Sequence, residues 1–259
     1  MTTARALLAL LGTGRQDGGI DVADLAAAGR VRGAIRGLRE KRGERPVGRK
    51  IGFSNARLWP VYGVDRPMWN YVWDTTLHAA GAGPLPLAGF AEPRIEPEIV
   101  LELAAAPEPG MDEAALLGCV GRVAHGFELV HSVFPGWRFT VAQCTAAFGL
   151  HGALLCGPWQ DIAARSGDWG RWLSDFSVTL SVNGRAIETG HASNVLGGPL
   201  RALKHLVDAI GADPGAPRLA AGELVSTGTL TDALPVRPGD LCETAVEGIP
   251  LPGLRLAFA

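Results

Sequence analysis

Pro93-Arg94-Ile95-Glu96-Pro97-Glu98-Ile99-Val100 is the stretch that decides both the fold and the chemistry of this chain. Side chains repeat every two residues in extended backbone, so Glu96 and Glu98 point to the same face of a strand and can bind one ion. Pro97 lacks the N–H of a ladder hydrogen bond, which favours a strand edge or a bulge beside a pocket over a central strand.

A third carboxylate lies further along in the apolar run Gly126-Phe127-Glu128-Leu129-Val130. Burying Glu128 there as a charge is costly unless something compensates it, and a hard divalent cation is one good compensator. The pattern therefore suggests an all-oxygen Mg²⁺ or Mn²⁺ site at Glu96, Glu98 and Glu128. The spacing alone leaves another interpretation open, because paired glutamates are common on solvated strands and Glu128 could be partly exposed or pair with an arginine.

Length and composition bound the class of protein. The chain has 259 residues, 47% of them hydrophobic, which is enough to bury a core in one large domain or in a main domain with a small lobe. A formal net charge of −2 without a long basic block gives no footprint for nucleic acid or an anionic membrane, so we expect a small-molecule partner. Four scattered cysteines without a CxxC pair argue against a zinc ribbon and a dense disulfide framework.

The first residues resemble neither a signal peptide nor a membrane span, and we expect a cytoplasmic protein. Hydrophobic periodicity predicts a helix that Asp21 caps and that runs to about Leu38, followed by an irregular aromatic-rich connection at 59–73. Further expected elements are helices at 111–120 and 199–210 and strands at 47–53, 99–103, 123–130, 176–182, 224–227 and 254–258. Asn183-Gly184 is a strong hairpin signal.

Strands outnumber helices in the second part without βαβ alternation, which favours a mixed, largely antiparallel β-roll or barrel over a doubly wound sheet. We therefore expect an α+β fold that is helical in its first forty residues and mainly β-strand from about Pro84 onward.

Several short motifs follow one another over nearly the whole chain. They are Gly48-Arg49-Lys50-Ile51-Gly52-Phe53-Ser54, Gly63-Val64-Asp65, Trp73-Asp74, Pro93 to Glu98, Glu128, Asn183-Gly184 and Ser226-Thr227-Gly228-Thr229-Leu230-Thr231. Each motif is weak alone, but their order and spacing together resemble the 2-keto-4-pentenoate hydratase and 4-oxalocrotonate decarboxylase branch of the fumarylacetoacetate hydrolase superfamily. The resemblance implies a small N-terminal helical lobe with its connecting strand and loop, which we place at residues 1–78, and a C-terminal catalytic domain at 79–259 that forms a mixed, largely antiparallel β-sandwich or roll.

The resemblance implies a homo-oligomer with Mg²⁺ or Mn²⁺ held by Glu96, Glu98 and Glu128. A 2-oxo acid would chelate such an ion through its carboxylate and 2-oxo oxygen, so that the metal stabilises an enolate. In a hydratase of 2-hydroxypenta-2,4-dienoate type, water then adds at C4. In a decarboxylase, the same enolate arises by loss of CO₂.

The resemblance also implies that Lys50 faces the pocket, where it would transfer protons or bind the substrate carboxylate. Asp74 matches an acidic position near the substrate and is our second catalytic candidate, although an Asp before two threonines is also an ordinary cap. For substrate binding we expect a set of small polar residues and one histidine at the pocket rim: Ser54, Thr227, Gly228, Thr229 and His131. The bland alternative for 227–229 is a glycine-containing strand end.

Two places depart from the family pattern. His131 stands where the typical hydratase has an Asp, and Gln143-Cys144 replaces an Asp-Asn pair, which leaves the metal logic intact and puts the exact substrate in doubt. An aromatic run, Phe134, Trp137, Phe139 and Phe148, suggests a larger or more apolar substrate tail or else a core. We expect Cys144 to be a buried thiol, since no base is marked beside it.

The leading functional hypothesis is a hydro-lyase acting on an unsaturated 2-oxo acid. A decarboxylase of a 4-oxalocrotonate-like acid comes second. An acylpyruvate C–C hydrolase comes third, because no His/Glu pair that could activate water is recognisable before Glu96. A non-enzymatic homologue comes last, since all three glutamates and Lys50 are present.

Overall fold

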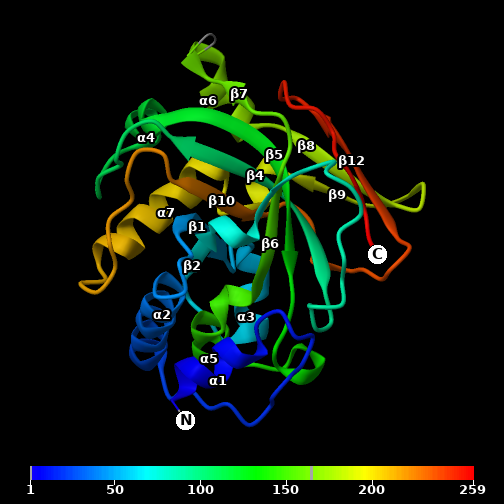
Figure 1. The fold of residues 1–259 in the computed structure, drawn as a ribbon. Helices are drawn as coiled ribbons and strands as arrows, with labels where there is room; N and C mark the ends of the chain where they lie inside the picture. Colours follow the sequence, from blue (N-terminus) through cyan, green and yellow to red (C-terminus); the bar gives the residue numbers. More distant parts are fainter. Residues whose placement is uncertain (1, 164–165) are drawn as a thin grey trace.

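Two sheets carry the fold in the computed structural model, which describes residues 2–163 and 166–259 (Figure 1). Within those residues the larger sheet has nine strands and is curled, with the order β2-β1-β10-β4-β5-β6-β3, β11 beside β4 and β7 beside β5. The smaller sheet has four strands in the order β13-β12-β8-β9. Pairing is antiparallel except between β1 and β10 and between β3 and β6. The expected α+β class with a mixed, largely antiparallel sheet is confirmed.

The strands of the larger sheet are β1 (Pro46–Gly52), β2 (Met68–Trp73), β3 (Leu77–Ala79), β4 (Arg94–Leu103), β5 (Val120–Val130), β6 (His151–Cys156), β7 (Gln160–Asp161), β10 (Leu224–Thr229) and β11 (Leu234–Pro235). Those of the smaller sheet are β8 (Ser177–Val182), β9 (Arg185–His191), β12 (Leu241–Glu247) and β13 (Arg255–Ala257). The α-helices are α1 (Thr3–Leu10), α2 (Leu25–Glu40), α3 (Trp59–Tyr62), α4 (Glu113–Cys119), α5 (Val141–Ala146), α6 (Ser166–Ser174) and α7 (Pro199–Gly211).

Strand β4 lies in the middle of the larger sheet, between β10 and β5. The side chains of β4 alternate between the two faces of the sheet. Ile95 and Ile99 are fully buried in apolar cores on one face, while Glu96 and Glu98 point to the opposite face. The edge position that Pro97 suggested is therefore wrong. The bulge is present, but it lies in the partner strand, because the β10–β4 register shifts between Ser226 and Thr229.

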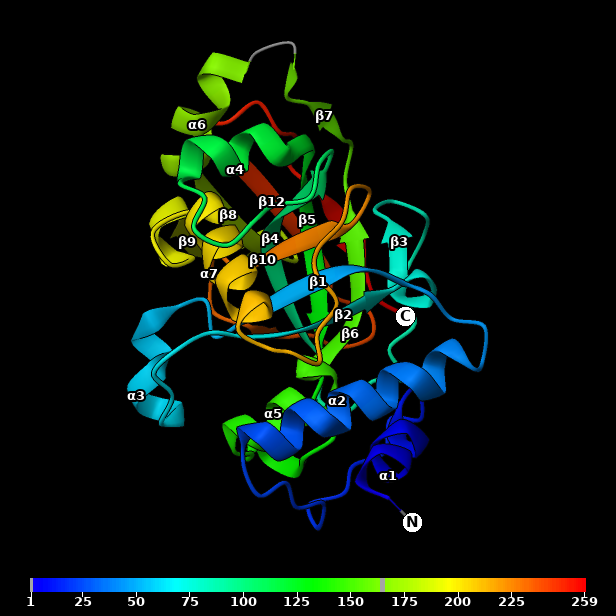
Figure 2. The same cartoon turned by 90° about the vertical axis from the view of Figure 1, so that its left-hand side faces the viewer.

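The helical lobe gathers below the sheet, where α1, α2 and α5 pack together (Figures 1 and 2). Helix α2 is capped by Asp24, which accepts a hydrogen bond from Ala27 N at 2.6 Å, and not by Asp21. Helix α5 comes from the middle of the chain, and β1 and β2 belong to the larger sheet. The division at residue 78 stays a prediction, with strands from both sides of it in one sheet.

A ladder of stacked arginines joins α2 to the sheet. The guanidinium of Arg32 lies 3.6 Å from the ring centroid of Trp69, that of Arg36 5.5 Å from Tyr71, and that of Arg39 4.3 Å from Trp73. The helix contributes every third or fourth residue and β2 every second one, which is the natural period of each element. The segment 68–73 is therefore a buried strand and not the irregular connection that we expected.

Other local expectations agree with the structure. Asn183 and Gly184 have φ values of 50° and 78° and connect β8 to β9 as a tight hairpin turn. Pro199 begins α7, and Asp112 caps α4 by accepting from Ala115 N at 2.8 Å. Among the helices of the described residues, none is both long and apolar enough to cross a bilayer.

Candidate active site

Three carboxylates meet on the face of the larger sheet opposite Ile95 and Ile99. Glu96 and Glu128 are directly paired in the β4–β5 register, and Glu98 lies two residues along β4. One carboxylate oxygen of each glutamate lies within 4.8 Å of the others. The structure thus brings together the three residues that the sequence singled out.

Glu98 is held by β10. Its Oε2 atom accepts hydrogen bonds from Ser226 Oγ and from Gly228 N, the latter at 2.9 Å. Gly228 has a φ of 104°, and a Cβ there would lie 1.9 Å from Ser54 Oγ, so only glycine can place this N–H against the carboxylate. The other oxygen, Oε1, is buried without a hydrogen-bond partner among the described residues.

Glu128 is fully buried and is flanked by two nitrogen groups. Its Oε1 accepts from His151 Nδ1 at 2.7 Å, and its Oε2 forms an ion pair with Lys50 Nζ at 3.2 Å. Lys50 comes from β1 and also donates to Gly149 O at 3.0 Å. A buried carboxylate with a cation on one oxygen and a fixed donor on the other has a defined orientation.

His151 continues this chain of contacts through Thr76, whose Oγ1 lies 2.8 Å from His151 Nε2. Burial holds the pKa of His151 well below its usual range, so the ring is neutral. A neutral ring that donates from Nδ1 to Glu128 has a free acceptor at Nε2 for the Thr76 hydroxyl, which also lies 3.1 Å from Trp73 O as a second acceptor. Sequence alone gives no signal that links His151 to Glu128, since the two lie 23 positions apart.

Burial and mutual repulsion dominate the electrostatics of the cluster. Burial raises the pKa of Glu96 and of Glu98 to about 8, and the neighbouring glutamates add to the effect. Burial acts to lower the pKa of Lys50, but the attraction of Glu128, Glu96 and Glu98 outweighs it and raises that pKa above the usual range. Lys50 is therefore an ammonium at neutral pH.

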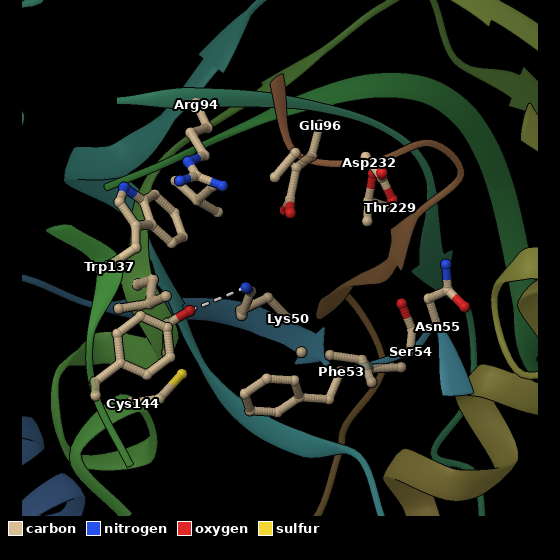
Figure 3. Close-up of a pocket in the computed structure, with 17 residues that line it drawn as sticks. Lys50, Phe53, Ser54, Asn55, Arg94, Glu96, Trp137, Cys144, Thr229 and Asp232 are labelled. Atoms are coloured by element: carbon tan, nitrogen blue, oxygen red, sulfur yellow. Dashed lines mark hydrogen bonds between the residues drawn. The ribbon is translucent and has the colours of Figure 1, made fainter. Parts of the chain in front are cut away.

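A cavity of about 260 Å³ opens beside the cluster (Figure 3). Lys50 lies at its centre and Glu96 above it, with Arg94 and Trp137 on one side and Thr229 and Asp232 on the other. The remaining walls are mostly apolar or small and come from residues far apart in the sequence: Ile51, Gly52, Phe53, Ser54, Asn55, Val130, Phe139, Cys144, Gly149, Leu150 and Ala233.

The predicted substrate-binding residues on β1 and β10 divide into two groups. Ser54 and Thr229 line the cavity, and Gly228 supports Glu98 behind it. The hydroxyl of Thr227 donates to Ile99 O at 2.9 Å and is fully buried, so this side chain packs on the opposite side of the strand. Alternation along β10 separates Thr227 from Ser226, whose side chain faces Glu98.

Asp74 does not reach the cluster. Its carboxylate accepts from Arg45 N at 3.0 Å and from Arg45 Nε at 3.1 Å, and it begins the short turn after β2. The backbone and side chain of Arg45 lower the pKa of Asp74. The structure makes Asp74 an ordinary turn residue tied to Arg45, which was the alternative interpretation of this position.

His131 also lies apart from the cavity. It follows Glu128 by an odd number of residues, and its buried ring packs edge-on against Phe90 at 5.4 Å between centroids. Its two ring nitrogens have no hydrogen-bond partner among the described residues, and burial lowers its pKa to about 4. The expectation that sequence proximity to Glu128 brings His131 to the pocket rim disagrees with this position, because neighbouring side chains alternate between faces.

The remaining departures from the family pattern have structural explanations. Gln143 forms a capping box with Thr140 at the start of α5 and donates to Ile20 O at 2.7 Å. Cys144 borders the cavity as a buried thiol, and burial raises its pKa to about 12, which leaves no thiolate at neutral pH. Of the aromatic run, Trp137 and Phe139 line the cavity, whereas Phe134 and Phe148 are buried in the core of the lobe.

Comparison with known proteins gives the same assignment as the site. The family profile described as fumarylacetoacetate (FAA) hydrolase C-terminal matches residues 74–252, more than half of the chain. The chain belongs to the fumarylacetoacetate hydrolase family. This member of the family is 28% identical to a 4-oxalocrotonate decarboxylase from Pseudomonas sp., over 85% of this chain and 82% of that protein. It is 30% identical to a 2-hydroxyhexa-2,4-dienoate hydratase from Comamonas testosteroni, over 82% of this chain and 78% of that protein.

The fold of this family member agrees with a solved relative. The structure of 4-oxalocrotonate decarboxylase from Pseudomonas putida G7, complexed with magnesium and adipate, superposes with a TM-score of 0.90 at 22% identity, over 99% of this chain and 96% of that one. This superposition establishes the fumarylacetoacetate hydrolase-like fold. The resemblance to the hydratase and decarboxylase branch is confirmed by the named relatives.

Proposed function

We propose that this chain is a metal-dependent hydratase that adds water to an unsaturated 2-oxo acid. The observation that carries the proposal is the cluster of Glu96, Glu98 and Glu128 at the edge of a cavity that also holds the ammonium of Lys50. A small organic acid is the class of substrate on which the named hydratase relatives act.

The donor set fits Mg²⁺ or Mn²⁺. All three groups are carboxylates, as hard cations prefer, and buried Glu98 Oε1 has no hydrogen-bond partner among the described residues. An unsatisfied buried carboxylate oxygen is costly, and coordination of a cation would satisfy it. When bound, the cation supplies charge stabilisation for the 2-oxo end of the substrate.

Lys50 has a defined part in this scheme. Its raised pKa keeps it protonated, so at neutral pH it donates a proton or attracts a carboxylate and is not a general base. Its contacts with Glu128 and with Gly149 O hold the ammonium at the centre of the cavity. This protonation state supports a role for Lys50 as a proton donor or as a cation that binds the substrate carboxylate.

The cavity walls suit the carbon chain of a small organic acid, because Phe53, Trp137, Phe139 and Leu150 give the cavity an apolar surface. In the part of the chain that the structure describes, no histidine lines the cavity, so a His/Glu pair for activating hydrolytic water is not seen there.

Decarboxylation is the second candidate. It is favoured by the similarity to 4-oxalocrotonate decarboxylases, which match this chain about as well as the hydratases do. Both reactions would place the same negative charge at the 2-oxo end of the substrate, and one cation with one ammonium can stabilise that charge in either case.

The deciding experiment is an ultraviolet assay with 2-hydroxypenta-2,4-dienoate and 4-oxalocrotonate, with Mg²⁺, with Mn²⁺ and after chelation, and with products identified by mass. Gain of water supports the hydratase, and loss of CO₂ moves the protein to the decarboxylase branch. Turnover that persists unchanged after complete chelation contradicts the metal-dependent proposal.

The proposal also covers the cellular location and the oligomeric state of the enzyme. All four cysteines are free and buried, which is compatible with the cytoplasmic location we propose. We also propose a homo-oligomer, following the resemblance to the family. Light scattering coupled to size-exclusion chromatography tests it, and a monomer at micromolar concentration contradicts it.

A further inference from the structure

The guanidinium of Arg94 lines the cavity and forms no ion pair with a residue that the structure describes, although its charge acts on Glu96 from a distance. Arg94 is half-buried, and its Cζ lies 4.0 Å from the ring centroid of Trp137. Figure 3 shows it pointing into the cavity on the Trp137 side. An arginine in such a place usually has a planar anion to bind, because its fork of N–H donors is costly to leave unused.

The stack with Trp137 fixes which part of the guanidinium is free. The indole Nε1 donates to Glu92 O at 3.0 Å, and Gly136 N donates to Glu92 Oε1 at 3.0 Å, so this turn is tied to the segment before β4. The indole covers one face of the guanidinium, and the edge with the N–H donors remains available. That edge matches a carboxylate, which can accept two parallel hydrogen bonds.

The position of Arg94 relative to the glutamates sets the distance to be bridged. Arg94, Glu96 and Glu98 share one face of β4 because they are two residues apart, and each step is roughly 7 Å along the strand. A short carbon chain bound at the glutamate end would therefore bring its other end to Arg94. Val130, opposite Arg94 in the β4–β5 register, and Phe139 provide apolar wall for the chain between the two ends.

Charge points the same way. A divalent cation and the Lys50 ammonium together balance the three glutamates, which leaves Arg94 as an unbalanced positive charge at its end of the cavity. Asp232 lies on the opposite side of the cavity and forms no ion pair with Arg94. A second negative group on the substrate would supply the missing charge.

We infer that Arg94 binds a second carboxylate, so that the preferred substrate is a 2-oxo diacid. The inference rests on the proposed function, since the 2-oxo end of the substrate is taken to lie at the glutamate cluster. It adds a specificity-determining residue at the other end of the cavity.

Two inert 2-oxo acids test the inference by binding alone. 2-Oxohexanedioate and 2-oxohexanoate have the same chain and the same 2-oxo end and differ only in the terminal carboxylate. Calorimetry with saturating Mg²⁺ is expected to show the diacid binding about ten- to a hundredfold more tightly to the natural protein, as for a charge-assisted hydrogen-bonded pair. In Arg94→Gln the preference should fall to near unity.

Two further variants make the result specific. Arg94→Lys keeps the charge without the fork and is expected to retain only part of the preference. Arg138→Gln makes the same charge change at an exposed residue next to Trp137 that does not line the cavity, and it should keep the full preference. Mn²⁺ binding, followed by electron paramagnetic resonance, reports whether each variant retains the glutamate cluster.

The outcomes separate the two proposals. If neither acid binds in the presence of Mg²⁺, the proposed function fails. If both bind equally to the natural protein, or if Arg94→Gln keeps the preference, the function stands and the role of Arg94 is overturned. Equal weakening of both acids together with weaker Mn²⁺ binding in Arg94→Gln would also overturn it, because Arg94 would then act only on the charge of Glu96.

Discussion

Lys50 Nζ lies 3.2 Å from Glu128 Oε2, and both side chains are buried where three carboxylates converge. The ammonium is the counter-ion of the cluster, and Lys50 also lines the cavity. A cation in this place reduces the repulsion among the glutamates, so the sheet can form before a metal ion is bound. The same contact fixes one oxygen of a proposed metal ligand.

Glu98→Gln should abolish metal-dependent activity and leave the fold intact. The change keeps the shape of the side chain and removes one negative charge that the cation needs. Activity with Mg²⁺ and Mn²⁺ affinity by calorimetry are the measurements. Glu102→Gln is a matched control on the same face of β4, where Glu102 pairs with Arg122 away from the cavity. Full activity of Glu98→Gln would show that the metal site is wrongly assigned.

Lys50→Met should lower kcat by about a hundredfold or more, the scale expected for a positioned proton donor. It should also lower the melting temperature in chelator, because Glu128 would lose its cation in a buried setting. Mg²⁺ should restore much of that stability by binding the folded state. Lys50→Arg, which keeps the charge, separates the two effects. A Lys50→Met variant with unchanged kcat would contradict the catalytic role.

His151→Leu should weaken Mn²⁺ binding by about ten- to a hundredfold, since a hydrogen-bonded partner orients the ligand that it contacts. His151→Asn retains a donor for Glu128 and should lose less. The comparison is made by calorimetry on folded protein, with circular dichroism to check the fold. Equal affinities of the Leu variant and the natural protein would reduce His151 to a packing residue.

Substitutions of the two buried histidines, His131 and His125, should have opposite effects on stability. Burial lowers the pKa of each ring from 6.5 to about 4, so between those values the unfolded chain binds protons that the folded chain does not. The two rings therefore do not reduce the free energy of unfolding above pH 6.5, and they reduce it progressively as the pH falls toward 4. At pH 5 each ring lowers the free energy of unfolding by about 2 kcal/mol.

His131→Phe removes a ring whose nitrogens lack partners and should raise stability at pH 5 relative to the natural protein. His125→Phe loses hydrogen bonds to Glu98 O and Thr244 Oγ1, both at 2.9 Å, and should destabilise the protein at pH 7. Urea denaturation at both pH values measures the differences, and other titrating groups cancel in the comparison. Destabilisation by His131→Phe at pH 5 would mean that its ring is not the unsatisfied group seen here.

Local pattern predicted the elements that hold the cluster, and it failed where contacts are long-range. The period of two in 93–100 was enough to place Glu96 and Glu98 on one face, and Asn183-Gly184 was enough for a hairpin. Helix α5 was missed because six residues are too few for a periodic signal. The contact between Arg94 and Trp137 joins two distant segments and exists only in the folded chain. The spacing of two residues between Arg94 and Glu96 was nevertheless a usable signal that both face the same side of the strand.

The resemblance predicted that Lys50 faces the cavity. Its protonation depends on the attraction of the three glutamates, which outweighs the effect of burial on its pKa and which the sequence alone does not show. Asp74 and His131 show the opposite limit. Asp74 matched a family position and His131 lies three residues after Glu128, yet one side chain turns to Arg45 and the other to Phe90. Proximity along a strand does not determine which face a side chain takes.

The arginine ladder fixes how α2 is placed along β2. From Arg32 to Arg39 the helix rises about 10 Å, and from Trp69 to Trp73 the strand rises about 13 Å, so the spacing of the arginines differs from that of the rings although three pairs stack. A slip of one helical turn would leave one of the three rings without an arginine of the helix, because Ala28 and Gly29 lie one turn before Arg32 and α2 ends one residue after Arg39. The full set of three stacks therefore forms in one register only, and β2 pairs directly with the strand that carries Lys50.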